Sequence, residues 1–327
     1  MEQQGQPLAP PLVLERLARS FAERNRCPSA WVGSDVARAR ATAAAWQDGA
    51  AGHPDVTEEW LALPGPAGRR IRVCVLRPAG ATGPLPVVLY LHGIGWMLGS
   101  ATAHRRLLAD LVLGVDAAVV VPEYDRVPEA RYPVAVEQGL AVAGWIADHG
   151  AQWQLDAGRM AVAGISAGAN LAAGVTLLAR RSAGIRFRHQ VLVCPVTDSA
   201  MDTPSYGLFA EGFFLGRAAM SGFWEAYVPD PGRRSESAAS PLRATAEELS
   251  GLPPALVVTA EADVVRDEGE AYAARMREAG VPVVSVRYQG TVHGFVLFGA
   301  LRESHASRAA RTQMTDTLHV ALHGGFS

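Results

Sequence analysis

Residues 160–168 read Met-Ala-Val-Ala-Gly-Ile-Ser-Ala-Gly, a short apolar run that ends in the pattern Gly164-x-Ser166-x-Gly168 and leads into an alanine-rich stretch. A serine at a tight strand-to-helix turn has a strained backbone, and bulky side chains two positions on either side of it would collide. Glycine at both positions removes those collisions. The stretch therefore predicts a buried strand, a sharp turn that presents the Ser166 hydroxyl, and a buried helix.

A membrane-spanning helix is the alternative interpretation, because residues 160–179 contain no charged side chain. Gly164 and Gly168 also have the Gly-x-x-x-Gly spacing of packed membrane helices. However, the segment begins with β-favouring alternation, and it contains Asn170, Thr176 and many small side chains of modest hydrophobicity. We therefore expect a buried strand and helix here, and no membrane span.

Length and composition indicate an ordinary globular chain: 327 residues, 49% hydrophobic, with a formal net charge of −2. One large domain with an appendage is expected, and no cationic patch suggests a nucleic-acid partner. Residues 1–7 lack the basic start and apolar run of a secretory signal, which favours a cytoplasmic location. The 3 cysteines are an odd number without metal-type spacing, so we expect reduced thiols and no metal site.

All 30 basic residues are arginine, and the sequence contains no lysine. A lysine Schiff base, a P-loop lysine and a serine–lysine dyad are therefore excluded. Another side chain must activate Ser166.

Strands and helices are expected to alternate along most of the chain. Two amphipathic helices at 8–24 and 35–47 form an amino-terminal segment, and strands at 57–63 and 70–77 open the sheet in antiparallel fashion. Further strands are expected near 86–91, 117–122, 159–164, 189–194, 255–260 and 283–289. The intervening helices are expected near 103–113, 134–148, 167–181, 267–279 and 302–321. This alternation predicts an α/β fold with a mostly parallel sheet covered on both faces.

The alternation is interrupted between Pro195 and Pro254, where the sequence is rich in aromatic residues and offers no clear strand. We interpret residues 200–240 as an inserted, partly helical lid. The domain prediction is then a helical cap segment at 1–54, the first part of the core at 55–199, the lid at 200–240, and the second part of the core at 241–327. Packing is the alternative role for these aromatic side chains. The candidates for lining a substrate pocket are Trp96, Ile165, Tyr206, Phe209, Phe213 and Phe214.

Three chemically capable residues follow the ends of predicted strands. Ser166 follows the fifth strand, Asp263 the seventh and His293 the eighth. The carboxyl ends of parallel strands meet at one edge of the sheet, where ligands bind in open α/β folds. A serine hydroxyl needs a base to become a nucleophile, and that base needs an anionic partner to fix its tautomer. The chain order serine, aspartate, histidine is that of α/β-hydrolase triads.

The sequence resembles the hormone-sensitive-lipase-like branch of the α/β-hydrolases, a group of bacterial carboxylesterases and lipases. That branch has a His-Gly-Gly-Gly loop, matched here by His92–Trp96, and a Gly-Asp-Ser-Ala-Gly elbow, matched at 164–168. Similar motifs lie at 122–129, at 240–244 and at 263–273, and the ending Val292-His-Gly-Phe295 is the most specific of them. The resemblance covers nearly the whole chain. It implies an α/β-hydrolase fold with an eight-stranded, mostly parallel sheet, helices on both faces, a helical cap and no cofactor.

The resemblance also implies a role for each matched residue. Ser166 would be the nucleophile, His293 the general base and then acid, and Asp263 the group that orients the imidazole. For the acid, the rivals are Glu261, Asp267 and Glu268, and Asp263 is preferred because its register matches the family. The backbone amides of Ile94, Gly95 and Ala167 would stabilise the oxyanion, and His92 would brace its loop.

Departures from the family pattern bear mainly on the substrate. Ile94 replaces the middle glycine of the loop, Ile165 an acidic residue, Asp125 an arginine and Val264 a proline. A β-branched side chain resists positive φ. Either the backbone at Ile94 is ordinary, and its side chain narrows the acyl or alcohol site, or the loop is rebuilt and loses one oxyanion donor.

We therefore expect a serine carboxyl-ester hydrolase that works through an acyl-enzyme on short or medium acyl esters or an acetylated small metabolite. A homodimer is one option for its assembly. Two alternatives remain at this point. One is a relative that performs acyl transfer, lactone closure or ligand binding on the same fold. The other is a nicotinamide oxidoreductase, suggested by Gly93-x-Gly95-x-x-x-Gly99 and by Glu123 near the end of the next strand.

Overall fold

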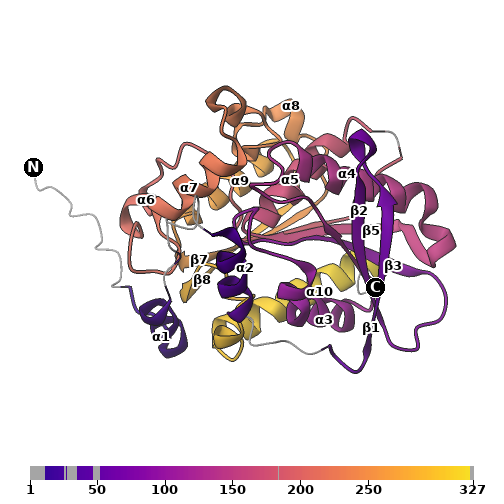
Figure 1. Ribbon diagram of the computed structural model, residues 1–327, viewed down its shortest axis with the longest axis horizontal. Helices are drawn as coiled ribbons and strands as arrows, with labels where there is room; N and C mark the ends of the chain where they lie inside the picture. The colour runs from indigo at the N-terminus through magenta and orange to yellow at the C-terminus, as the bar shows by residue number, and fades with distance from the viewer. Residues whose placement is uncertain (1–11, 26, 28–34, 47–51, 183, 325–327) are drawn as a thin grey trace, which may run out of the picture.

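An eight-stranded sheet runs through the middle of the protein. The computed structural model describes residues 12–25, 27, 35–46, 52–182 and 184–324 (Figure 1). Within these residues the strands lie side by side in the order β1-β2-β4-β3-β5-β6-β7-β8. Their bounds are β1 Val56–Pro64, β2 Arg70–Pro78, β3 Leu85–Leu91, β4 Ala118–Glu123, β5 Leu155–Ile165, β6 Gln190–Val193, β7 Ala255–Ala262 and β8 Val283–Val292.

The strand directions confirm the predicted sheet. β1 pairs with β2, and β2 with β4, in antiparallel register, whereas every pairing from β4 to β8 is parallel. β5 starts before the predicted residue 159, because Leu155 already pairs with Leu85 and a register shift follows between Pro86 and Val87. Glycine and aspartate in the first residues of β5 conceal this extension in the sequence.

Helices cover both faces of the sheet (Figure 1). On one face lie α3 (Ala101–Val115) and α10 (His305–His323). On the other face lie α4 (Val134–His149), α5 (Ala167–Ala179) and α9 (Arg266–Glu278). Nearly every side chain of α5 is buried, which explains why this helix is apolar all round rather than amphipathic.

Side-chain caps set two helix starts that the apolar pattern leaves imprecise. The Ser100 hydroxyl accepts a hydrogen bond from the Ala103 amide, so α3 begins at residue 101 rather than 103. The Ser304 hydroxyl accepts from the Ser307 amide, so α10 begins at residue 305 rather than 302. Arg302, which the prediction placed in the helix, instead forms a bidentate ion pair with Asp110 of α3 at 2.7 Å.

Shorter elements lie at one end of the sheet and in the loops. The amino-terminal helices are α1 (Arg16–Arg24) and α2 (Val36–Ala45), and the segment predicted to be inserted contains α6 (Pro204–Leu208) and α7 (Arg217–Tyr227). α8 (Ala246–Leu249) precedes β7. Short 3₁₀ turns lie at Pro66–Gly68, Gly150–Trp153, Pro231–Ser235, Pro241–Arg243 and Gly299–Leu301.

The first helix begins later than predicted. Of the predicted helix at 8–24, residues 8–11 lie outside the described residues and 12–15 are not helical. The Glu15 amide donates to the carbonyl of Gly290 at 2.8 Å, and the Glu15 carboxylate accepts from the first two amides of α10 at 2.9 Å. These contacts with distant segments hold the chain extended up to residue 15, which local sequence does not predict.

Arg40 docks α2 against loops of the core. Its guanidinium donates to the carbonyls of Met97 (2.9 Å) and Val127 (3.1 Å) and to both carboxylate oxygens of Glu129 (2.8 and 2.7 Å). This hydrogen bonding lowers the pKa of Glu129 to about 2. The amino-terminal segment is thus fixed to the loops that follow β3 and β4, at the carboxyl ends of the parallel strands.

None of the helices seen in the described part of the chain combines the length and apolar character needed to cross a bilayer. The buried segment at 160–179 is a strand followed by a helix, as predicted.

Candidate active site

Ser166 lies at the sharp turn between β5 and α5. Its backbone angles are φ 56° and ψ −123°, a conformation that non-glycine residues adopt only where the surrounding structure enforces it. The Ser166 amide donates to the carbonyl of Val193 in β6 at 2.8 Å, and its carbonyl accepts from the Asn170 amide at 3.0 Å. Both sides of the turn are therefore anchored by backbone hydrogen bonds.

The glycines beside Ser166 are required by close backbone contacts. A Cβ at Gly164 would lie 2.3 Å from the carbonyl oxygen of Gly168, and a Cβ at Gly168 would lie 2.0 Å from that of Leu91. Gly93, in the loop after β3, faces the same turn, since its Cβ would lie 2.3 Å from the carbonyl oxygen of Ile165. The collisions expected from the sequence are thus backbone contacts, which side-chain rearrangement cannot relieve.

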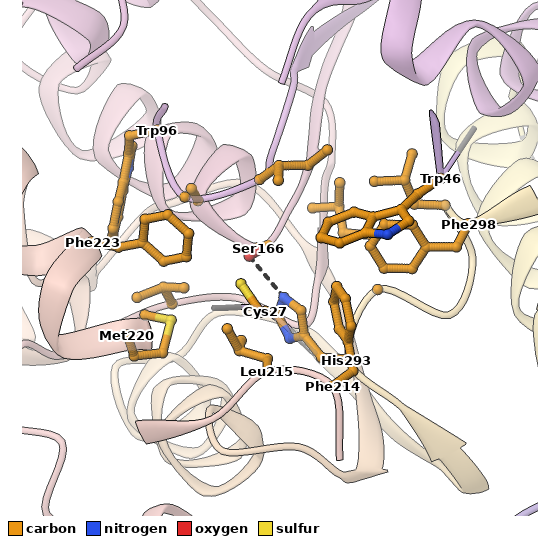
Figure 2. Close-up of a pocket in the computed structure, with 17 residues that line it drawn as sticks. Cys27, Trp46, Trp96, Ser166, Phe214, Leu215, Met220, Phe223, His293 and Phe298 are labelled. Atoms are coloured by element: carbon orange, nitrogen blue, oxygen red, sulfur yellow. Dashed lines mark hydrogen bonds between the residues drawn. The ribbon is translucent and has the colours of Figure 1, made fainter. Parts of the chain in front are cut away.

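His293, at the end of β8, connects Ser166 to Asp263, which follows β7. Nε2 of His293 lies 2.9 Å from the Ser166 hydroxyl, and Nδ1 lies 2.8 Å from a carboxylate oxygen of Asp263 (Figure 2). Because an ionised carboxylate can only accept, Nδ1 donates to Asp263 and Nε2 accepts from the serine. The other oxygen of Asp263 accepts from the Val265 amide at 3.1 Å. All three side chains are buried.

The three rival acids have other partners. Glu261 accepts from the amide of Gly290 at 2.7 Å. Asp267 accepts from the amide of Ser205 at 2.8 Å and from Arg266. Glu268 is fully buried and accepts from the amide of Thr197, also at 2.7 Å, and burial raises its pKa well above the usual range. Of the four carboxylates, Asp263 is the one that reaches the imidazole of His293.

His92 lies beneath the loop after β3. It is fully buried, it stacks on Tyr124 with ring centroids 4.1 Å apart, and the Tyr124 hydroxyl donates to the His92 carbonyl at 2.8 Å. Burial lowers the pKa of His92 well below its usual range, with His104 and Arg126 adding to the effect. A neutral imidazole in this position packs under the loop and carries no ionic charge.

Ile94 adopts a left-handed conformation, with φ 70°, and Gly95 and Trp96 follow with φ 63° and 56°. Of the two alternatives for Ile94, the ordinary backbone is therefore wrong. A left-handed β-branched residue costs about 1–2 kcal/mol. The surrounding contacts hold the loop: the Ile94 carbonyl accepts from Leu98 at 3.0 Å, and the Trp96 carbonyl accepts from Val127 at 3.1 Å.

The amides of Ile94, Gly95 and Ala167 are available to a ligand. None of them donates a hydrogen bond to any residue that the structure describes. All three residues line the same pocket as Ser166 and His293. The loop with consecutive positive φ values and the start of α5 therefore bring free donors to the cavity beside the serine hydroxyl.

The pocket beside Ser166 is small and predominantly apolar, with a cavity volume of about 30 Å³. In Figure 2 the rings of Trp96 and Phe223 lie on one side of the serine, and those of Trp46 and Phe298 lie on the other. Besides Ser166, His293 and the three residues with free amides, the lining consists of Cys27, Trp46, Trp96, Ile165, Val196, Phe214, Leu215, Met220, Phe223, Gly294, Leu297 and Phe298.

The six predicted pocket residues divide into two groups. Trp96, Ile165 and Phe214 line the pocket, whereas Tyr206, Phe209 and Phe213 are not among the residues that line it. Tyr206 is fully buried in α6, and Phe209 packs edge to face on Phe213 at 5.2 Å.

Hydrogen bonds of Ser205 explain where α6 lies. Its hydroxyl donates to the carbonyl of Val264 at 2.6 Å, and its amide donates to Asp267 at 2.8 Å. These bonds hold α6 on Val264 and on the first turn of α9, so its one aromatic side chain, Tyr206, is buried outside the pocket lining. Packing, the alternative role for the aromatic side chains of this segment, therefore applies to Tyr206, Phe209 and Phe213.

Sequence reasoning missed Cys27 and Trp46 as pocket residues. Cys27 follows α1, and its amide donates to the carbonyl of Phe214 at 2.9 Å. Burial raises the pKa of its thiol to about 12, so it is a neutral wall of the pocket. Trp46 ends α2, and its ring packs on Phe214 and Phe298 at 5.1 and 5.6 Å. No local pattern marks either residue, because their position depends on the docking of the amino-terminal segment.

Two residues from the sequence arguments have structural partners. Glu123 accepts from the amide of Ala101 at the start of α3, so its carboxylate is engaged within the fold. Asp125 forms an ion pair with Arg69 at 2.7 Å and a hydrogen bond with Gln138. Neither contact points to a nicotinamide dinucleotide or to a direct role beside Ser166.

Comparison with known proteins agrees with this geometry. A family model described as alpha/beta hydrolase fold matches residues 88–297. The esterase LipI of Mycobacterium tuberculosis is 36% identical over 276 residues, 83% of this chain and 84% of its own. The carboxylic ester hydrolase LipN of the same organism is 40% identical over 251 residues, 75% of this chain and 65% of its own.

A solved structure shows the same fold. A thermostable esterase from Pseudomonas putida superposes with a TM-score of 0.90 at 40% identity, covering 97% of this chain and 99% of that one. The chain belongs to the hormone-sensitive-lipase-like branch of the α/β-hydrolase family. Within that branch it is a serine carboxylesterase.

Proposed function

We propose that this esterase hydrolyses esters of short or medium acyl groups, or an acetylated small metabolite, through an acyl-enzyme on Ser166. The observation that carries the proposal is the hydrogen-bonded line from Ser166 through His293 to Asp263 at the wall of a small apolar pocket. Serine, imidazole and carboxylate have the geometry in which a hydroxyl can lose its proton as it attacks.

In the acylation half of the proposed reaction, the Ser166 oxygen attacks the ester carbonyl while its proton passes to Nε2 of His293. Asp263 holds the opposite ring nitrogen and stabilises the imidazolium that forms. As the tetrahedral intermediate collapses, the bond between the carbonyl carbon and the alcohol oxygen breaks, and His293 gives its proton to the alcohol. A water molecule then attacks the acyl-serine in the same way, which releases the acid and restores the hydroxyl.

The amides of Ile94, Gly95 and Ala167 are the proposed oxyanion donors. Their support is that all three face the pocket and have no hydrogen-bond partner among the described residues. The left-handed backbone at Ile94 preserves a glycine-like loop although the residue is not glycine. Each preorganised donor of this kind contributes about 3 kcal/mol to lowering the barrier.

The size of the pocket supports a short acyl group. A volume of about 30 Å³ is room for roughly two water molecules. We expect this space to favour an acetyl group, and longer acyl chains to press against the surrounding apolar side chains. Among the described residues that line the pocket, the aromatic and aliphatic side chains offer no charged partner for a polar substituent.

A fluorophosphonate probe and an ester panel test the proposal together. We expect the probe to form a covalent adduct that maps by mass spectrometry to the peptide containing Ser166. We also expect p-nitrophenyl acetate and butyrate to be hydrolysed, with kcat/KM falling steeply for longer chains. Labelling at a different residue would contradict the proposed mechanism. Highest activity on long-chain esters would contradict the proposed substrate class.

Replacing Ile94 by glycine tests the role of this side chain in acyl selection. Ile94→Gly should raise the ratio of kcat/KM for butyrate over acetate by roughly tenfold, since two buried methylenes contribute about 1.6 kcal/mol. Glycine also accepts the φ of 70° without strain, so the loop keeps its shape. Steady-state kinetics on the two p-nitrophenyl esters measures the ratio.

The matched control is Ile94→Val, which keeps the β-branched side chain and most of its volume. Its ratio should stay near the wild-type value. An unchanged ratio in the glycine variant would place the acyl group elsewhere in the pocket.

A further inference from the structure

Cys194 lies directly behind the catalytic carboxylate. It follows β6, and its Sγ, a carboxylate oxygen of Asp263 and a ring nitrogen of His293 all lie within 4.8 Å of one another. The exposed fractions of the three residues are 1%, 1% and 5%, so this cluster is sealed from solvent. The thiol of Cys194 takes no part in the proposed serine mechanism.

The backbone holds Cys194 in an unusual conformation. Its φ is 43°, in the left-handed region, and its amide donates to the carbonyl of Val258 in β7 at 2.7 Å. The carbonyl of the preceding residue, Val193, accepts a hydrogen bond from the amide of Ser166 at 2.8 Å. The end of β6 therefore supports the nucleophile through its backbone while it directs a thiol toward Asp263. Strained backbone of this kind is concentrated at functional sites.

The carboxylate of Asp263 has room for another donor. Nδ1 of His293 donates to one oxygen and the Val265 amide to the other. An ionised carboxylate offers about four acceptor positions, so a third hydrogen bond can be accommodated. A buried carboxylate with unused acceptor positions is costly, and a further donor lowers that cost.

The chemistry of the thiol suits it to donate. Burial, followed by the negative charge of Asp263, raises the pKa of Cys194 well above its usual range, so sulfur keeps its proton. The backbone of Gly294, directly after His293, acts in the opposite direction and lowers this pKa. Nδ1 of His293 already donates to Asp263 at 2.8 Å, so the imidazole and the carboxylate beside the thiol are hydrogen-bonded to each other.

We propose that Cys194 is a positioning residue of the active site, whose thiol donates a hydrogen bond to Asp263 and holds the carboxylate in the orientation that His293 requires. This inference rests on the proposed serine mechanism. With this bond, two donors besides His293 stabilise the negative charge of Asp263, namely the Val265 amide and the Cys194 thiol. Its loss would strengthen the attraction between Asp263 and the imidazolium, which favours protonated His293.

Replacing Cys194 by alanine or serine tests the inference. For Cys194→Ala we expect kcat on p-nitrophenyl acetate to fall about tenfold with little change in KM, because one hydrogen bond to a charged group is lost. The acid limb of the kcat/KM profile should move to higher pH. Cys194→Ser restores a donor, so we expect it to recover most of kcat and to return the acid limb to the wild-type position or below.

Cys74→Ala is the matched control, because Cys74 is also a buried cysteine but lies in β2, on a strand that carries none of the triad. It should leave the pH profile unchanged. If Cys194→Ala does not fold, Cys194→Gly replaces it, since glycine removes the thiol and accepts the positive φ of this position.

Two results would overturn the inference. One is a wild-type kcat and pH profile after removal of the thiol. The other is an equal loss of activity and melting temperature in the alanine and serine variants, which would indicate packing alone. Failure of the serine mechanism itself is distinguishable, because Ser166→Ala would then remain active.

Discussion

Ser166→Ala is expected to reduce hydrolysis of p-nitrophenyl acetate by on the order of 10⁴-fold or more, because among the described residues Ser166 carries the hydroxyl that bonds to Nε2 of His293. The hydroxyl is one end of the hydrogen-bonded line through His293 to Asp263. Alanine removes only the oxygen, and it keeps the Cβ and the backbone bonds of the turn. The pocket should therefore still bind ester, so the loss should appear in kcat rather than in KM. Steady-state kinetics with thermal melting as a fold check measures it.

Ser235→Ala is the control for this change, because Ser235 is an exposed serine in a 3₁₀ turn and is not among the residues that line the pocket. It should retain wild-type activity and fluorophosphonate labelling. Ser166→Ala should lose labelling completely. A variant without the Ser166 hydroxyl that still turns over esters at a rate close to wild type would require a different nucleophile.

Asp263→Asn is the second change with a large expected effect, a fall in kcat of about 10⁴-fold. Asparagine has nearly the same shape, but its amide can present a donor to Nδ1 of His293. The imidazole would then carry its proton on Nε2, where it cannot accept from Ser166. The Val265 amide can still bond to the side-chain oxygen, so the local fold should persist. Kinetics and the rate of fluorophosphonate labelling should fall together.

Asp267→Asn provides the comparison for the acid. Asp267 is four residues further along, and its carboxylate bonds to Arg266 and to the amide of Ser205 rather than to His293. Its substitution should change kcat by no more than a few fold, about 1 kcal/mol or less in barrier height. If the two variants lose activity equally, the orienting role assigned to Asp263 would have to be withdrawn.

Local sequence patterns predicted most of the fold because the forces that form these elements are local or periodic. The apolar runs of β3 to β7 and the all-round apolar α5 belong to segments buried on both sides. A Cβ atom added at position 164 or 168 would lie less than 2.5 Å from a backbone oxygen, so both positions require glycine. This requirement makes the turn at Ser166 recognisable from the sequence. The starts of α1 and α10 were misplaced because Glu15 and Arg302 bind distant segments.

The walls of the pocket could not be predicted in the same way. Phe213 and Phe214 are neighbours in the sequence, yet only Phe214 lines the pocket, and it packs on Phe298 and Trp46 from other segments. Which of two adjacent rings points inward depends on how α7 and the amino-terminal segment dock. The left-handed backbone of Ile94 is a similar case, since its stability comes from contacts made by the whole loop.

The sequence alone is enough to predict the alternation of strands and helices, the turn at Ser166, and the order in which serine, aspartate and histidine follow their strands. These features depend on the spacing of apolar residues and on glycine, which act over a few positions. The folded protein is needed to show that Asp263 rather than its neighbours reaches His293, that Cys194 lies within 4.8 Å of that pair, and that Cys27 and Trp46 line the pocket beside the serine. Those contacts join residues far apart in the chain, and they form only when the whole sheet and its covering helices pack together.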